Sequence, residues 1–290
     1  AIDRLAAASL GPELPADPEP RVRTLEIWRA AMMALRGPAG SRLLVAAASP
    51  GGAPRDLAID RIAEPGQTVL LGNLPPLKLR VESAAVETAS GQAAGVIGFN
   101  VWMAAADAPF AAAIDRFRGA RGIVIDLRGN PGGLAGMIMG ISGHFFADRT
   151  ALGTMKTRTS ELTFFANPRR SRPDGTVVDV YDGPVAILID GLTGSASECF
   201  AGGMQSVGRA RVFGEVSMGQ ALPASFTRLP NGDTLLHAIA DFVTADGTRL
   251  EGRGVVPDQA VALDPVELAA GRDPVLDAPL AWIADERRGG

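Results

Sequence analysis

The sequence has very few of the residues that build metal centres or disulfide scaffolds. It contains one cysteine, Cys199, which cannot form an internal disulfide, and two histidines, His144 and His237, without metal-ligand spacing. Only two lysines are present, Lys78 and Lys156, and neither lies in a recognisable catalytic motif. We therefore expect no disulfide scaffold, no metal site and no cofactor.

Two further absences exclude whole classes of function. No window reaches about 18 uninterrupted apolar residues, so we expect no membrane span. The net charge is −4, so no basic surface for nucleic acid is visible. With 47% apolar and 21% charged residues, the composition is that of a globular protein with one large or two smaller domains. The chain begins with Ala-Ile-Asp, without a methionine or a signal peptide, and we expect a processed protein or an excised fragment.

The first part of the chain predicts a small module of helix and hairpin. Residues 24–37 have the apolar spacing of a helix. Residues 42–49 and 54–62 have the composition of two strands, separated by a Pro-Gly-Gly turn. We assign residues 1–64 to this module and residues 65–93 to a linker with short extended pieces.

Apolar strands alternate with helical stretches from about residue 94 onward. The strands are continuous apolar runs, such as "GIVIDL" and "AILID", and helical spacing follows them. This alternation predicts an α/β fold, in which a largely parallel sheet carries helices on both faces. It also predicts one longer strand and turn over residues 233–247 and a final helix over residues 265–285. We assign residues 94–290 to one core.

Two strand-to-helix turns have an unusual composition, and such turns are where open α/β sheets bind ligands. The first, "IDLRGNPGG", has three glycines and a proline after its strand. Without a Cβ, Gly132 and Gly133 can turn their N–H groups toward a ligand. The loop lacks the G-x-G-x-x-G pattern of a dinucleotide site. A tight structural turn is the alternative interpretation.

The second turn, "GLTGSASECF", puts two serines one residue apart at the start of a helix. Ser195 and Glu198 fit the S-x-x-E capping box, which would explain both residues structurally. A serine in this place also lies beside unpaired amides and the positive end of the helix dipole, which would stabilise an oxyanion if Ser195 attacked a carbonyl. The motif alone leaves both interpretations open. Ser197 is expected to cap the helix or to pack inside the site.

Three stretches together resemble the C-terminal-processing (tail-specific) serine proteases and their tricorn-core and retinoid-binding relatives. They are "GIVIDLRGNPGG", "PVAILIDGLTGSASECFAGGMQSVGRARVFGE" and "ADGTRLEGRGVVPD", in the order and spacing of that family, and they cover most of residues 94–262. The resemblance implies a ClpP/crotonase-like core. It also implies that residues 1–64 are the end of a PDZ-like α+β module, whose start is not in this chain.

The resemblance assigns roles to individual residues. Ser195 matches the family nucleophile, and the amide of Ala196, with a glycine amide from Gly132 or Gly133, matches the oxyanion hole. Arg128 is expected to bond local carbonyls and so organise its loop. The implied substrate is a peptide or protein chain, and the family usually works in the periplasm or outside the cell.

The sequence departs from the processing proteases at the general base. Those enzymes use a lysine in a Gly-Lys-Gly turn shortly after "GE", and here that turn reads "GEVSMGQAL", with Gln220 at the lysine position. A glutamine side chain cannot accept a proton at neutral pH. The usual aspartate of the family helix is also replaced, by Ser206. A serine–lysine dyad is therefore not supported.

The tricorn-like branch instead uses serine, histidine and glutamate. Glu251 falls at the glutamate position, although a surface carboxylate near Arg249 or Arg253 is the alternative role. The branch's histidine lies upstream of the core, in a segment that this chain does not contain. Of the two histidines present, His144 is expected to lie too far from Ser195 for a hydrogen bond and to be a packed or capping residue. His237 is the best reserve base, although packing in or on a sheet is its alternative.

Three functions stay open on the sequence alone. The leading one is a serine peptidase that forms an acyl-enzyme on Ser195, with a base supplied upstream or by His237 and oriented by Glu251. The main alternative is an inactive peptide- or ligand-binding protein on the same scaffold, because a fold does not establish an activity. The third is a catalytic core that is inactive only because it was truncated. The oligomeric state is not predicted.

Overall fold

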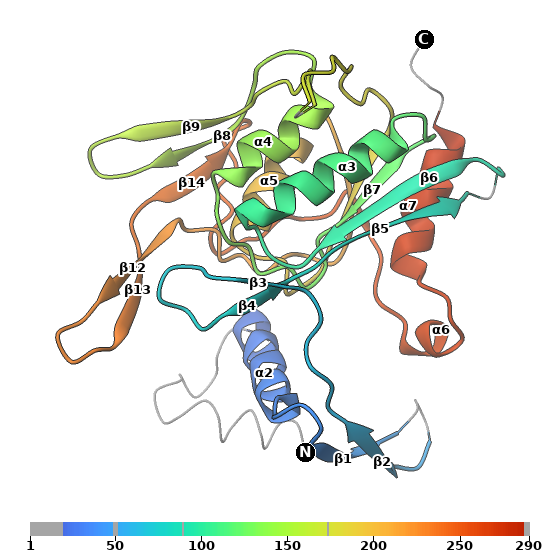
Figure 1. Ribbon diagram of the computed structural model, residues 1–290, viewed down its shortest axis with the longest axis vertical. Coiled ribbons are helices and arrows are strands. Elements are labelled where there is room, and N and C mark those ends of the chain that lie inside the picture. The colour runs from blue at the N-terminus through green and yellow to red at the C-terminus, as the bar shows by residue number, and fades with distance from the viewer. Residues whose placement is uncertain (1–19, 49–51, 89, 173, 287–290) are drawn as a thin grey trace. The chain divides into compact units, whose positions relative to one another are not determined.

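The computed structural model describes residues 20–48, 52–88, 90–172 and 174–286. The chain divides into two compact units. The first comprises residues 1–65 with 264–271, and the second comprises residues 66–263 with 272–290. Figure 1 shows the elements of both units, which are described separately below.

The first unit contains the predicted helix and hairpin. Helix α2 runs over Pro20–Leu35, and strands β1 (Arg42–Ala47) and β2 (Arg55–Asp60) pair antiparallel. The short helix α6 (Pro265–Ala269) also belongs to this unit. The turn expected between the two strands falls partly on residues 49–51, which lie outside the described residues.

The second unit is built on a six-stranded sheet that is largely parallel, as predicted. The strand order is β15-β11-β10-β7-β6-β5, and only the edge strand β5 runs antiparallel to its neighbour. The strands span Val81–Glu87 (β5), Ala93–Phe99 (β6), Ile123–Asp126 (β7), Val185–Ile189 (β10), Arg211–Gly214 (β11) and Gln259–Ala260 (β15).

Helices cover both faces of this sheet because its central strands are apolar on both sides. In β10, Val185, Ile187 and Ile189 join one hydrophobic core, while Ala186 and Leu188 join a second core on the opposite face. The first core packs against α3 (Asp107–Phe117), α4 (Met137–Ser142), a 3₁₀ turn (Gly143–Phe145) and α5 (Ala196–Ser206), and the second core packs against α7 (Pro274–Asp285). Figure 1 shows α7, in red, apart from the other three helices.

The predicted linker over residues 65–93 is wrong. These residues contain β3 (Gln67–Val69), β4 (Leu77–Leu79) and β5, which is an edge strand of the six-stranded sheet. Val69 and Leu79 are buried in a small hydrophobic cluster, so the short extended pieces are part of the second unit rather than a connector.

Two predicted long elements are each divided in two. The final helix is interrupted at Gly271, which has a φ of +79°, and restarts at Pro274 with Asp273 as its N-cap. The strand predicted over residues 233–247 forms β13 (Thr234–Ala238) and β14 (Asp241–Thr244) in different sheets. Four strands have no counterpart in the sequence prediction: β8 (Thr150–Lys156), β9 (Glu161–Ala166), β12 (Ala224–Arg228) and the short β15 (Gln259–Ala260).

Among the residues that the structure describes, none of the helices is long and apolar enough to cross a membrane.

Candidate active site

Ser195 lies at the turn between β10 and α5, in a conformation that serine rarely adopts. Its φ is 52° and its ψ is −118°, and among the described residues it is the only non-glycine residue with a positive φ. A side chain in this region of φ/ψ space is strained by about 1–3 kcal/mol, and such strain persists only where surrounding contacts impose it. The residue is partly exposed at the N-terminus of α5.

The buried carboxylate of Glu198 imposes this conformation. Glu198 is fully buried, and its Oε2 accepts hydrogen bonds from the N–H groups of Ser195 and Gln220, both at 3.0 Å. Its Oε1 accepts from the Ser217 hydroxyl at 2.6 Å and from the Gly219 N–H at 2.5 Å. Burial raises the pKa of Glu198, and these four hydrogen bonds oppose that shift.

The capping box predicted for Ser195 and Glu198 is therefore uneven. The Glu198 carboxylate binds the Ser195 N–H, as the motif requires. The reciprocal contact of the box, between the Ser195 side chain and the Glu198 N–H, is also present but does not reach the geometry of a full hydrogen bond. Glu198 does more than cap, because it joins the serine turn to the segment 217–220.

A second carboxylate holds the residues that follow Gln220. Glu251 accepts hydrogen bonds through Oε2 from the N–H groups of Ala221 at 2.8 Å and Leu222 at 3.1 Å. The carbonyl of Gln220 in turn accepts from the Ser195 N–H at 3.1 Å. The structure thus brings Ser195, Gln220 and Glu251 into one neighbourhood through backbone contacts. The side chain of Gln220 is exposed.

The glycine loop after β7 lies directly against Ser195. A Cβ added to Gly132 would lie 2.6 Å from the Ser195 Cβ and 2.9 Å from the Ala196 nitrogen. The Gly132 N–H donates to the side-chain oxygen of Asn130 at 3.0 Å. Within the described part of the chain, the N–H groups of Gly133 and Ala196 donate no hydrogen bond.

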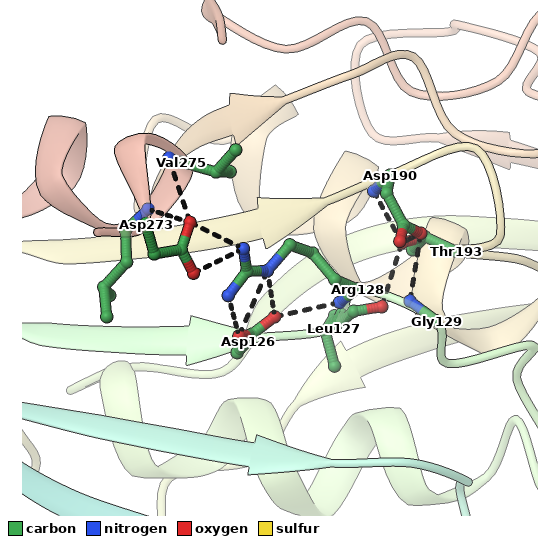
Figure 2. Close-up of polar contacts among 9 residues, drawn as sticks. Asp126, Leu127, Arg128, Gly129, Asp190, Thr193, Asp273 and Val275 are labelled. Carbon is green, nitrogen blue, oxygen red and sulfur yellow. Dashed lines mark hydrogen bonds and ion pairs between the residues drawn. The ribbon is translucent and has the colours of Figure 1, made fainter. Parts of the chain in front are cut away.

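Arg128 anchors this loop through carboxylates rather than through the carbonyls we expected (Figure 2). Its guanidinium binds Asp126 at 2.6 Å and Asp273, the N-cap of α7, at 2.8 Å. Burial opposes the charge of Arg128, but the two carboxylates raise its pKa above the usual value. On the other side of the loop, Asp190 accepts the Gly129 N–H at 3.0 Å.

His237 is not part of this site, so its role as a reserve base is wrong for this structure. It lies on strand β13 in a two-stranded hairpin with β12, where its ring is exposed and its Nε2 lies 3.1 Å from the Thr227 hydroxyl. Figure 1 shows this hairpin extending away from the sheet and helices of its unit. The alternative expected from the sequence, packing on a sheet surface, describes it better.

His144 is packed in the core, as expected, and its environment predicts acid sensitivity. Its side chain is buried beside Phe110 and Phe145, and neither ring nitrogen has a hydrogen-bond partner among the described residues. Burial, with a contribution from Arg169, lowers its pKa to about 4 from 6.5. Between these values the unfolded chain binds a proton that the folded chain does not.

Proton uptake by His144 in the unfolded chain should therefore lower the free energy of unfolding by up to about 3 kcal/mol as the pH falls from about 6.5 to 4. His144→Leu should weaken this pH dependence in urea unfolding measured across that range. The matched control is His237→Leu, which replaces the exposed histidine and so separates the effect of the buried His144 from the loss of a histidine elsewhere. Equal pH slopes for wild type and His144→Leu would contradict the prediction.

Sequence reasoning missed several residues that shape the site. Glu198 was seen only as a helix cap, and its bonds to Ser217 and Gly219 depend on a fold that brings distant segments together. Asn130 and Trp102, described further below, carried no signal beyond the glycine turn and a buried strand. No group of three or more His, Cys, Asp or Glu side chains among the described residues could hold a metal ion.

Comparison with protein families gives a match to the model of peptidase family S41 over residues 93–261. A carboxyl-terminal-processing protease of Synechocystis sp. is 27% identical over 242 residues, which cover 82% of this chain and 52% of that protein. A probable CtpA-like serine protease of Staphylococcus haemolyticus is 30% identical over 145 residues, covering 50% of this chain and 28% of the relative. The chain therefore spans about half the length, or less, of these two relatives.

Solved structures of low sequence identity share the fold. The photosystem II D1 C-terminal processing protease superposes with a TM-score of 0.54 at 23% identity, covering 83% of this chain and 59% of that one. Mature CPAF superposes with a TM-score of 0.63 at 12% identity, covering 98% of this chain and 73% of that one. The family match includes β6, β7, β10, α5 and β11, and with them the serine turn and the glycine loop. This chain belongs to peptidase family S41.

Proposed function

We propose that the protein is a serine peptidase that hydrolyses peptide bonds through an acyl-enzyme on Ser195. The observation that carries the proposal is the strained serine itself. Its conformation is unfavourable in isolation, yet Glu198 and the segment 217–220 maintain it at a strand-to-helix turn. Strained turns of this kind present a serine hydroxyl to a substrate in hydrolases, and a structural cap does not require them.

Two backbone donors are available for an oxyanion beside this hydroxyl. The N–H groups of Ala196 and Gly133 donate no hydrogen bond to other described residues. Gly132, which precedes Gly133, lies in close contact with Ser195 and with the nitrogen of Ala196. Ala196 is also the first residue of α5, where the helix dipole favours negative charge. Gly132 itself is a poorer donor than we expected, because its N–H is bound to Asn130. We assign the oxyanion hole to Ala196 and Gly133.

Among the described residues around Ser195, we identify no side chain that would serve as its general base. Gln220 lies where a base would act, but an amide does not accept a proton at neutral pH. Glu251 holds residues 221 and 222 with Oε2, while Oε1 accepts no hydrogen bond from the described residues. We propose that a histidine from a segment outside this chain supplies the base and that Glu251 orients it.

The substrate that fits this proposal is an extended peptide or protein segment. Residues 1–64 would help to select it if they complete a PDZ-like module, and the resemblance supports this role for the helix and hairpin of the first unit. The same resemblance implies a periplasmic or secreted protein. Fractionation of cells that express the full-length gene product tests the location.

The experiment is a cleavage assay with the full-length protein and an unstructured peptide, with either a free or an amidated C-terminus. We expect cleavage products by mass spectrometry, and faster cleavage of the peptide with the free carboxylate. A peptide that remains intact while the protein binds it would contradict the peptidase proposal.

That outcome would favour the second candidate function, an inactive peptide-binding protein. The observation in its favour is Gln220, which stands at the position of the family's lysine but cannot accept a proton at neutral pH. A fluorophosphonate probe separates the two functions, because it reacts with an activated serine and requires no peptide. Failure of the full-length protein to react would support the binding function.

A further inference from the structure

The glycine loop and the serine helix are joined by a buried chain of hydrogen bonds that starts at Trp102. Its indole Nε1–H donates to the hydroxyl of Ser197 at 2.8 Å, and this hydroxyl donates to the carbonyl of Asn130 at 3.0 Å. Trp102 is 1% exposed, and Ser197 and Asn130 are fully buried. Each donor in this chain has one acceptor, so the orientation of the Ser197 hydroxyl is fixed.

Asn130 connects the loop to the turn that carries Ser195. Its carbonyl also accepts the N–H of Gly194 at 3.0 Å, and its side-chain oxygen accepts the N–H of Gly132 at 3.0 Å. Its side-chain amide donates to the carbonyl of Phe99 at 2.7 Å, at the end of β6. A single buried residue therefore fixes the loop relative to both the serine turn and the sheet.

The backbone of Trp102 holds the peptide groups on both sides of Gly133. Its N–H donates to the Gly132 carbonyl at 2.9 Å, and its carbonyl accepts the Leu134 N–H at 2.8 Å. A Cβ added to Gly133 would lie 2.4 Å from the Trp102 carbonyl oxygen, so only glycine fits there. Between these two bonds, the N–H of Gly133 donates to none of the described residues.

We infer that Trp102 is a positioning residue that sets the Gly133 N–H relative to the Ser195 hydroxyl, acting through Ser197 and Asn130. The inference rests on the proposed function, because it assigns the Gly133 N–H to the oxyanion. Its structural part stands independently: the indole N–H restrains the loop 128–134. Trp102→Phe removes the N–H together with part of the ring that packs against Phe99 and Phe200, whereas Ser197→Ala removes the acceptor of the N–H and leaves this ring in place.

The test uses Trp102→Phe and, as a second variant, Ser197→Ala, both in the full-length protein. The first readout, for both variants, is hydrogen exchange of the backbone amides in peptides that cover residues 128–134. Trp102→Phe loses one buried hydrogen bond, about 1.4 kcal/mol, and should increase exchange about tenfold. Ser197→Ala loses two and should increase exchange at least as much. Trp282→Phe is the matched control, because Trp282 lies on α7, its indole N–H donates to the C-cap residue Glu286 at 2.8 Å, and the change should leave this loop unchanged.

The second readout is the rate constant for reaction with a fluorophosphonate probe. We expect about a tenfold decrease in Trp102→Phe and Ser197→Ala, no further decrease in the double variant, and the wild-type rate in Trp282→Phe. Unchanged exchange in Trp102→Phe would overturn the inference, whether or not the wild type reacts with the probe. Increased exchange with an unchanged reaction rate would also overturn it, because the loop would then not act on Ser195. A wild type that does not react with the probe contradicts the proposed function instead.

Discussion

Gln220→Lys is expected to increase peptide hydrolysis by this chain at least about a hundredfold at alkaline pH. The backbone of residue 220 is fixed against Ser195 by the Ser195 N–H, which donates to the Gln220 carbonyl at 3.1 Å, and by Glu198, which accepts the Gln220 N–H. A lysine side chain that starts there can reach the serine hydroxyl and act as its general base, a contribution of about 10²- to 10⁴-fold. The measurement is the initial rate of cleavage of a fluorogenic peptide.

The pH profile and a matched variant identify the cause of such a gain. A lysine base works in its neutral form, so the rate should rise with pH toward the pKa of the new lysine. Gln220→Arg is the control, because it adds the same charge but remains protonated throughout this range. If Gln220→Lys were no faster than Gln220→Arg, residue 220 would not lie at the base position.

Glu198→Gln is expected to remove about 3–4 kcal/mol of folding free energy and most of the reactivity of Ser195. In either orientation, the new amide group turns an NH₂ toward one pair of donors, either Ser217 and Gly219 or Ser195 and Gln220. The Ser217 hydroxyl already accepts the N–H of Val255 at 2.7 Å, and if it also accepted from the new amide its own proton would lose the acceptor that Glu198 provides. Two hydrogen bonds to a buried charged group are thus lost.

Urea unfolding and the fluorophosphonate reaction rate measure the two effects of Glu198→Gln. The control is Glu215→Gln, which makes the same chemical change at an exposed glutamate two residues before Ser217. We expect the control to behave as the wild type in both measurements. A Glu198→Gln protein with wild-type stability and wild-type reactivity would show that Glu198 does not maintain the serine turn.

The elements predicted best from the sequence are those with strong local patterns. The apolar runs of β7 and β10 appear where they were expected, because their burial on both faces determines their composition. Strands β8 and β9 were missed because their mixed composition gives no clear alternation, and their pairing with each other and with β14 is a tertiary property. The predicted linker failed for the same reason.

The site was predictable to the extent that it lies in contiguous motifs. The serine turn and the glycine loop are each local sequences, and the structure brings them together because their strands, β10 and β7, are paired in parallel. The second role of Glu198, the anchoring of residues 221 and 222 by Glu251, and the link from Trp102 to Ser197 join residues that are distant in the sequence. A single sequence contains no periodicity that would reveal such pairs.

The central claim is that Ser195 is an activated nucleophile beside two backbone donors that no other described residue uses. It is tested most directly by treating the full-length protein and its Ser195→Ala variant with a fluorophosphonate and locating the adduct by mass spectrometry. The account predicts one adduct per wild-type chain, on Ser195, and none on the variant. An unreactive wild type, or an adduct that persists in Ser195→Ala, would contradict it.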